Sequence, residues 1–320
     1  MAAVFRIVKP GLLTTVQDLG RTGYQQYGMV VSGAMDIYAL QVGNLLVGNE
    51  RGEAGLEITI MGPEIELLED AVIAICGADL SATVDNKPAP LWKSFYVQQG
   101  QTIRFGRPVS GARAYITVAG GISIPTVMGS KSTYMKAQVG GVDGRELQKG
   151  DVIEKGKPTF HNRGLVSRSL KSSLVPDYER DQTLRVILGP DEQAFHESSI
   201  GTFLSEAYEI SPQSDRMGYR LQGAKLTHVS GADILSDAIF PGTIQVPASG
   251  EPIILLADRQ TTGGYTRIGT VISVDLPYLG QMLPGNKISF QAVSIDEAQA
   301  LNVKREKAFR QLSLGAGIIN

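Results

Sequence analysis

Four segments of the chain place polar side chains between glycines, and their residue types and spacing could do chemistry on an oxygen-rich small molecule. They are residues 14–21, 32–36, 129–133 and 258–265. Glycine accepts positive φ and lets backbone N–H groups approach a ligand closely. Neighbouring hydroxyl and amide groups can then bind a carboxylate, a carbonyl or a phosphate. The pattern therefore predicts a small-molecule site built from several loops.

Carboxylates and arginines in and near these segments are candidates for acid/base chemistry and for anion binding. The acid/base or orienting candidates are Asp18, Asp215 and Asp258. The candidates for binding substrate are Arg21, Ser32, Ser130, Arg216, Gln260, Thr262, Gly263, Gly264 and Tyr265. An Asp and an Arg in one short segment can instead form a charge-assisted pair that fixes a loop, so both interpretations stay open for positions 18, 21, 215 and 216. Function is favoured for 258–265, because this polar stretch directly follows an apolar strand, where a loop is presented to a site.

The chain also contains a degraded copy of itself. Asp18, Arg21, Gly23 and Tyr24 recur as Asp215, Arg216, Gly218 and Tyr219, and the pattern Gly-x-x-Ile-x-Phe occurs at 100–105 and again at 285–290. The offsets are 219 − 24 = 195 and 285 − 100 = 185, which fits one duplication with small insertions. Chance similarity of short turns is the alternative. A duplication predicts two related units, with their seam as a natural place for a site.

Short β-branched runs between Gly and Pro turns predict a mainly β protein, as a sandwich or barrel. We expect strands at 56–60, 71–75, 94–97, 101–105, 114–118, 184–188, 242–246, 252–257, 269–274 and 287–290. Helices are expected at 35–47 with Asp36 near its start, at 191–204, and at 294–312 with Ser294 and Glu297 as a capping box. The weakly periodic stretch 155–180 predicts the connection between two domains, 1–165 and 166–320, the second with the C-terminal helix.

Composition excludes several function classes. The formal net charge of −2 and the pI near 6.0 argue against a nucleic-acid partner or an anionic membrane surface, and no run reaches the roughly 20 apolar residues of a membrane helix. The single cysteine, Cys76, cannot form an internal disulfide, which predicts a reducing, cytoplasmic location. No complete phosphate loop occurs, and residues 129–132 only hint at one. The three histidines lack zinc-like spacing, so no metal is expected.

Several motifs in order resemble one known family. The opening Pro-Gly-Leu-Leu-Thr-Thr-Val-Gln-Asp-Leu-Gly-Arg at 10–21 is similar to the signature of the KipA family, also called allophanate hydrolase subunit 2, biotin-dependent carboxyltransferase or the C subunit of 5-oxoprolinase. Further matches lie at 32–36, 46–49, 129–133, 140–145, 214–219, 241–247 and 261–265. The resemblance spans roughly residues 5–290, nearly the whole chain.

This resemblance implies two pseudo-repeated cyclophilin-like β-barrel domains, with a few helices, and a KipI-like partner, the B subunit. It implies that the chain is the C subunit of an ATP-dependent 5-oxoprolinase, which converts 5-oxo-L-proline to L-glutamate together with an A subunit. ATP would be handled through the complex, and no biotin would be attached to this chain. Two alternatives remain: a regulatory protein that counteracts a KipI-like inhibitor of a histidine kinase, and the carboxyltransferase component of a biotin-dependent, urea-type carboxylase.

Overall fold

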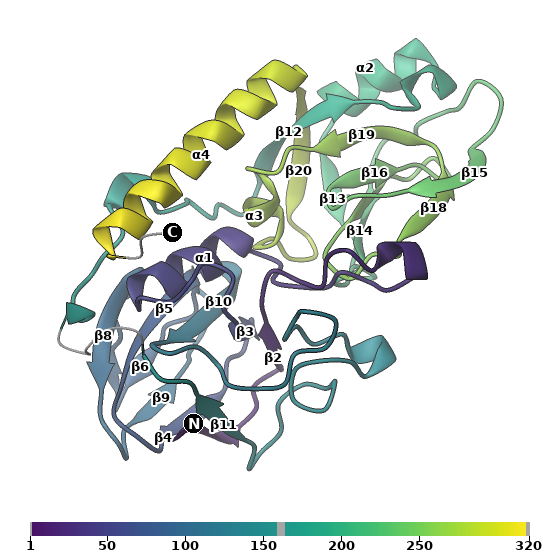
Figure 1. The fold of residues 1–320 in the computed structure, drawn as a ribbon. Coiled ribbons are helices and arrows are strands. Elements are labelled where there is room, and N and C mark those ends of the chain that lie inside the picture. The colour runs from purple at the N-terminus through teal and green to yellow at the C-terminus, as the bar shows by residue number, and fades with distance from the viewer. Residues whose placement is uncertain (1, 159–163, 318–320) are drawn as a thin grey trace. The chain divides into compact units, whose positions relative to one another are not determined.

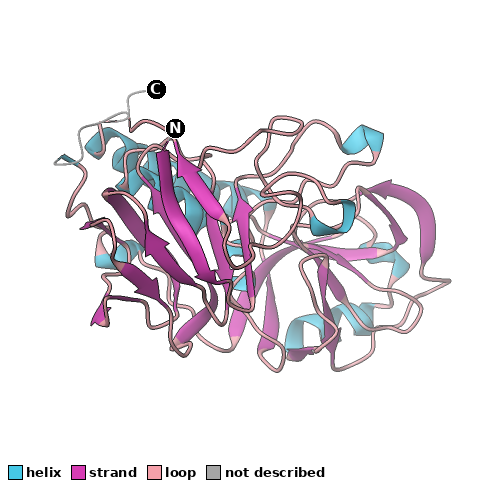
Figure 2. Cartoon of the chain, turned by 90° about the horizontal axis from the view of Figure 1, so that it is seen from below, coloured by secondary structure: helices cyan, strands magenta, loops and turns pink. Residues whose placement is uncertain are grey.

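The computed structural model describes residues 2–158 and 164–317. The chain divides into two compact units. Unit 1 comprises Met1–Thr22, Ser32–Tyr178 and Ala308–Asn320, and unit 2 comprises Gly23–Val31 and Glu179–Lys307. Strands are the main regular structure, with few helices (Figure 2). The predicted mainly β class is therefore confirmed.

Unit 1 contains two antiparallel sheets around one apolar core. The six-stranded sheet has the order β11-β1-β4-β9-β6-β7, and the five-stranded sheet has the order β2-β3-β10-β5-β8. Alternating or continuous apolar runs bury Ile58, Ile73 and Ile116 completely, which explains why these segments form strands. Helix α1 (Ile37–Leu46) lies against β5 and β10 (Figure 1). The strands are β1 Ala2–Lys9, β2 Leu13–Gln17, β3 Gly55–Thr59, β4 Glu64–Leu67, β5 Ala71–Asp79, β6 Thr83–Val84, β7 Lys87–Pro88, β8 Lys93–Val97, β9 Thr102–Arg104, β10 Ser110–Val118 and β11 Val152–Lys155.

Unit 2 is built on a closed seven-stranded barrel, with the order β12-β19-β16-β17-β14-β13-β20. Phe203 and Phe290 stack with ring centroids 4.4 Å apart, and Tyr208 packs beside them in the core. A separate two-stranded sheet pairs β15 with β18. The strands are β12 Gln182–Leu188, β13 Tyr208–Ile210, β14 Gly218–Gln222, β15 Asp233–Ala238, β16 Thr243–Gln245, β17 Ile253–Leu255, β18 Thr262–Tyr265, β19 Arg267–Val271 and β20 Lys287–Ala292, and the helices are α2 Glu197–Ser205, α3 Leu276–Leu279 and α4 Ile295–Gly315. Short 3₁₀ turns occur in the chain at Gln25–Tyr27, Met135–Ala137, Ser172–Leu174 and Glu192–Ala194.

Every strand that the sequence predicts overlaps an observed one, and two of the predicted helix starts are confirmed. Asp36 caps α1 by accepting a hydrogen bond from the Ala39 N–H at 2.9 Å. Ser294 and Glu297 form the expected capping box at α4, with reciprocal bonds of 2.8 and 3.2 Å. The helix expected at 191–204 is shorter, because α2 begins only at Glu197.

Two segments expected as loops are partly strands. Residues 14–17 belong to β2, and 262–265 form β18, where Gly263 pairs with Asp237 of β15. Glycines weaken strand propensity in the sequence, but they also permit close approach of another group. A Cβ at Gly263 would meet the Gln245 side-chain amide, which would have to shift to make room.

The repeated patterns adopt matching local geometry. Gly100 and Gly285 have φ of +86° and +84°, and each precedes a strand. Their N–H groups donate to the carbonyls of Leu67 and Ile210, both at 2.8 Å. Ile103 of β9 and Ile288 of β20 are both fully buried. This shared turn supports the duplication over chance similarity.

The division between the units lies after Tyr178, downstream of the predicted boundary at 165/166. The segment before it is attached to unit 1. The Tyr178 hydroxyl donates to Asp36 at 2.6 Å, the Leu170 N–H donates to the Trp92 carbonyl at 2.9 Å, and the Tyr38 hydroxyl donates to the Leu174 carbonyl at 2.8 Å. Part of the predicted connection 155–180 is thus packed structure, and residues 159–163 lie outside the described part of the chain.

Candidate functional site

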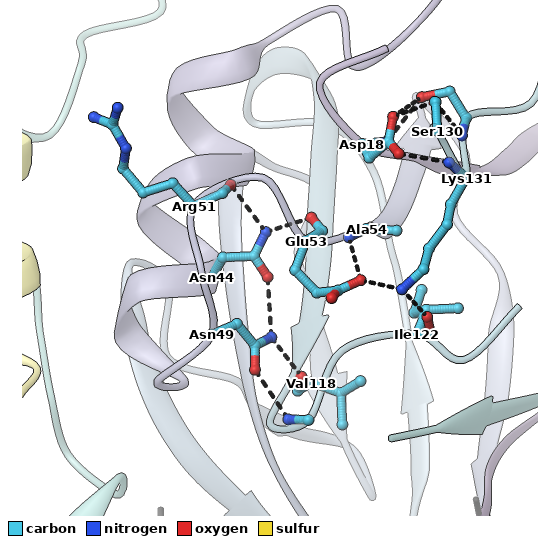
Figure 3. Close-up of polar contacts among 12 residues, drawn as sticks. Asp18, Asn44, Asn49, Arg51, Glu53, Ala54, Val118, Ile122, Ser130 and Lys131 are labelled. Carbon is cyan, nitrogen blue, oxygen red and sulfur yellow. Dashed lines mark hydrogen bonds and ion pairs between the residues drawn. The ribbon is translucent and has the colours of Figure 1, made fainter. Parts of the chain in front are cut away.

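Asp18 is the centre of a polar cluster in unit 1, directly after β2. Its carboxylate accepts hydrogen bonds from Ser130 Oγ at 2.7 Å and Lys131 N at 2.6 Å (Figure 3). It also accepts from Gly20 N at 2.8 Å and Ser132 Oγ at 2.5 Å. The residue is only 7% exposed. These contacts are those of an acid that fixes two distant loops to each other. The catalytic assignment of Asp18 stays a prediction.

The phosphate-loop-like segment 129–132 folds around this internal carboxylate. Its backbone and hydroxyl groups face Asp18, while the Lys131 ammonium pairs with Glu53 at 2.5 Å and donates to the Ile122 carbonyl at 2.7 Å (Figure 3). A phosphate loop needs free N–H groups and a free lysine. The residues of this segment therefore do not fit a nucleotide phosphate.

Arg21, Ser32 and the third glycine-bounded segment meet in the same cluster. The Arg21 guanidinium donates to the Ser132 carbonyl, and the Ser32 hydroxyl donates to the Thr133 carbonyl at 2.9 Å. Gly140 has φ of +70°, and a Cβ there would strike the Ser132 carbonyl oxygen. The structure thus brings together the four candidates of unit 1, although residues 18–32 and 130 lie about a hundred positions apart.

An amide network that sequence reasoning missed supports Glu53. Asn44 on α1 donates to the Glu53 carbonyl at 2.6 Å, and Asn49 donates to Asn44 Oδ1 at 3.1 Å and to the Val118 carbonyl at 2.8 Å (Figure 3). Asn49 belongs to the motif at 46–49, which is the sequence signal that could have identified this residue. The network links α1, β10 and the turn that carries Glu53, so it positions the partner of Lys131.

In unit 2, Arg216 and Asp258 form a buried, two-pronged ion pair. Arg216 Nε lies 2.9 Å from Asp258 Oδ2, and Nη2 lies 3.2 Å from Oδ1. The Asp258 N–H also donates to the Arg216 carbonyl at 2.9 Å. The neighbouring Asp215 accepts from Met217 N at 2.7 Å, as Asp18 does from Gly20 N, two residues further on. The three predicted acids therefore fix turns, and their predicted acid/base roles remain to be tested.

The segment after β17 keeps part of its polar surface open. Gln260 and Thr262 are exposed, and Tyr265 is 40% exposed. Gln245 of β16 is buried beneath this segment, and its Nε2 donates to the Tyr265 carbonyl at 3.2 Å. Gln245 was not among the candidates, although the motif at 241–247 contains it. The open side chains of Gln260, Thr262 and Tyr265 suit recognition of a polar ligand.

Arg259 is a further residue that sequence reasoning missed. It is 7% exposed, its Nε donates to the Ile239 carbonyl at 3.3 Å, and its Nη1 donates to the Leu256 carbonyl at 3.1 Å. Burial lowers the pKa of Arg259 to about 10. The sequence offered little signal, because an arginine after an aspartate looks like its ion-pair partner.

No set of three or more His, Cys, Asp or Glu side chains in residues 2–158 and 164–317 is arranged to hold a metal ion. The helices in these ranges include none long and apolar enough to cross a bilayer.

Comparison with known proteins assigns the family. The carboxyltransferase domain family, subdomains A and B, matches residues 27–292. The chain belongs to this family. It is 37% identical to the C subunit of 5-oxoprolinase from Escherichia coli over 310 residues, covering 97% of this chain and 98% of that protein. It is 38% identical to the Haemophilus influenzae protein of the same name, covering 91% of this chain and 92% of that one. The predicted family resemblance is confirmed.

Solved structures of similar proteins agree with the fold. Kluyveromyces lactis urea amidolyase superposes with a TM-score of 0.90 at 29% identity, covering 97% of this chain. The protein TTHA0988 superposes with a TM-score of 0.81 at 31% identity, covering 91% of this chain. This chain spans 20% of the urea amidolyase and 55% of TTHA0988. The matching region is therefore one part of a longer polypeptide in each of those proteins.

Proposed function

We propose that this chain is the C subunit of an ATP-dependent 5-oxoprolinase, acting with a KipI-like B subunit, together with an A subunit, to convert 5-oxo-L-proline to L-glutamate. The observation that carries the proposal is the two-way coverage with the E. coli C subunit, 97% of this chain and 98% of that protein. By contrast, the chain covers only 17% of the Saccharomyces cerevisiae urea amidolyase, at 32% identity. Near-complete coverage of the E. coli protein therefore favours the 5-oxoprolinase role.

The proposed reaction explains why polar loops are needed. A lactam amide is resonance-stabilised, and opening a favoured ring requires coupling to ATP. Phosphorylation of the amide oxygen would give an electrophilic imidate, which water attacks, releasing phosphate and the opened amino acid. Such a site must hold an anionic substrate in place and stabilise developing charge on oxygen.

We assign substrate contact to the segment after β17 in unit 2. Gln260 and Thr262 are exposed, and Gly264 beside them is partly exposed. Arg216 and Asp258 hold the start of this segment through their ion pair. Asp18, Ser130 and Ser132 do the corresponding work in unit 1, by fixing the loop at 129–133.

ATP is proposed to bind through the partner subunits. The segment most similar to a phosphate loop uses its amides, hydroxyls and lysine on Asp18 and Glu53. Loss of the Lys131–Glu53 pair is therefore expected to alter the stability of unit 1 rather than the affinity of the complex for ATP. A cytoplasmic location likewise stays a proposal.

The test is reconstitution with each protein omitted in turn. The purified chain is combined with its KipI-like partner and a homologue of the A subunit, and ATP hydrolysis and glutamate release are followed with 5-oxo-L-proline. Glutamate release that requires all three proteins supports the proposal. Tight binding to the KipI-like partner without turnover would refute it and favour the regulatory alternative.

The carboxyltransferase activity is the second candidate, since the matching family and the urea amidolyase structure both point to it. It predicts dependence on a biotin carrier supplied in trans. Activity that survives complete removal of biotin with avidin excludes this candidate.

A further inference from the structure

The two arginines that the sequence nominates for anion contact are both engaged inside their units. Arg216 forms the two-pronged pair with Asp258, and Arg21 donates to the Ser132 carbonyl. Arg259 differs from Arg216, because no acidic side chain in the described part of the chain pairs with it. It also lies in the segment with the open polar groups, between Asp258 and Gln260.

The surroundings of Arg259 hold its guanidinium in a fixed orientation. Nε and Nη1 donate to two backbone carbonyls, those of Ile239 and Leu256. The Ile239 N–H in turn donates to the Thr261 carbonyl at 3.3 Å, which joins the two sides of the turn. Nη2 has no hydrogen-bond partner among the described residues, and this atom is not fully buried. Nη2 therefore keeps some contact with solvent.

Burying an arginine without a counter-charge is unfavourable. Carbonyl groups satisfy donors but supply no negative charge, so the desolvation penalty of the cation is only partly offset. Burial is the cause that lowers the pKa of Arg259 to about 10, and no neighbouring acid opposes it. The guanidinium is already oriented and its charge is poorly compensated, so binding of an anion there would stabilise the protein.

We propose that Arg259 binds the carboxylate of the small-molecule substrate, through its Nη2 group. The inference rests on the proposed function for the identity of that substrate, 5-oxo-L-proline. A guanidinium held in a fixed orientation suits a carboxylate, because its Nη2 group can donate a charge-assisted hydrogen bond to a carboxylate oxygen. Arg259 thereby distinguishes the acid from uncharged lactams.

The experiment pairs a change in the residue with a change in the ligand. In the reconstituted complex, Arg259→Gln is expected to raise KM for 5-oxo-L-proline about 10- to 100-fold with little change in kcat. A change of this size corresponds to the loss of one hydrogen bond to a charged group. KM for the uncharged 5-oxoprolinamide should be the same in wild type and variant. Arg259→Lys, which keeps the charge without the planar guanidinium, should give a KM between those of wild type and Arg259→Gln. Arg220→Gln is the matched control, since Arg220 is an exposed arginine of β14 in the same unit.

A second measurement needs no turnover. Thermal shifts of the purified chain are recorded with 5-oxo-L-proline and acetate, and with their uncharged amides. Carboxylates should stabilise wild type but not Arg259→Gln. The Tm of the unliganded variant should not fall, because an uncompensated buried charge is removed.

The outcomes separate this inference from the proposed function. Turnover with an unchanged KM in Arg259→Gln overturns the carboxylate site alone. A variant that assembles poorly with normal KM shows that the guanidinium pairs with an acid of a partner protein, which also overturns it. If there is no turnover but carboxylates alone raise the Tm, the 5-oxoprolinase function is refuted and the carboxylate site at Arg259 is supported. Absent turnover and absent shifts overturn both.

Discussion

Replacing Asp258 by asparagine tests whether this acid holds the loop or reacts with substrate. The substitution is nearly isosteric, and it removes the negative charge from a pair in which both side chains are about one-tenth exposed. The Arg216 guanidinium would then face an amide oxygen at 2.9 Å in place of a carboxylate. Since the pair fixes the segment after β17 to the start of β14, the effect should appear first in the stability of unit 2.

The magnitude follows from the burial of the pair. Removing one partner of a buried ion pair costs about 3–5 kcal/mol, because the other charge is left uncompensated. Asparagine keeps one acceptor, so we expect the lower end, about 3 kcal/mol. For a unit of this size, about 2–4 °C is lost per kcal/mol, which gives a decrease in Tm of about 6–12 °C.

The assay is thermal and urea unfolding of the chain, followed by turnover in the reconstituted complex. Asp233→Asn is the control, because Asp233 is an exposed acid of β15, and it should change stability by no more than about 0.5 kcal/mol. The double variant Arg216→Met/Asp258→Leu should recover most of the lost stability, since no charge is then buried unpaired. An unchanged Tm together with abolished turnover would refute this reasoning and assign Asp258 to acid/base chemistry.

Three further predictions concern unit 1. Gly140→Ala should destabilise the chain by at least about 2 kcal/mol more than Gly129→Ala in urea unfolding, because the two glycines have similar φ of +70° and +74° but only the Cβ at 140 meets backbone atoms. The Arg145 guanidinium lowers the pKa of Asp151 in the folded chain. The stability that this ion pair contributes is therefore present above the pKa of an unfolded aspartate, about 3.9, and is lost as the pH falls through the lower pKa of the folded state. The Tm difference between wild type and Asp151→Asn should therefore shrink below about pH 4, and a constant difference would contradict the pairing. Phe309→Ala should cost about 3–5 kcal/mol in the same unfolding assay, since this buried ring anchors the end of α4, and an unchanged midpoint would disprove that role.

The elements that the sequence predicted share strong local signals. The strands at 71–75 and 114–118 are continuous apolar runs, and α4 carries a complete capping box. β18 was expected as a loop, because its two glycines suppress strand propensity and its pairing with β15 depends on residues far along the chain. Local pattern cannot report such pairing, since the energy comes from contacts that exist only after folding.

The same limit applies to the site residues: the sequence identified the residue types but not their contacts. The sequence identified Asp18, Arg216 and Asp258 as chemically capable, and the structure places them in hydrogen-bonded pairs and clusters. It could not reveal that Ser130 and Ser132 face Asp18, because these contacts join residues 112 and 114 positions apart. The predicted catalytic and binding roles themselves stay predictions.

The most conspicuous motif residues are therefore not necessarily those that meet a ligand. A charge that the fold already pairs would have to break that pair before binding substrate, at a cost of several kcal/mol when the pair is buried. Groups with an unused donor or acceptor face no such cost. Gln245 Oε1 and Arg259 Nη2 have no partner among the described residues; Arg259 lies in the segment after β17, and Gln245 contacts it. If substrate binds in unit 2, these atoms should contribute more to specificity than the carboxylates of Asp215 and Asp258.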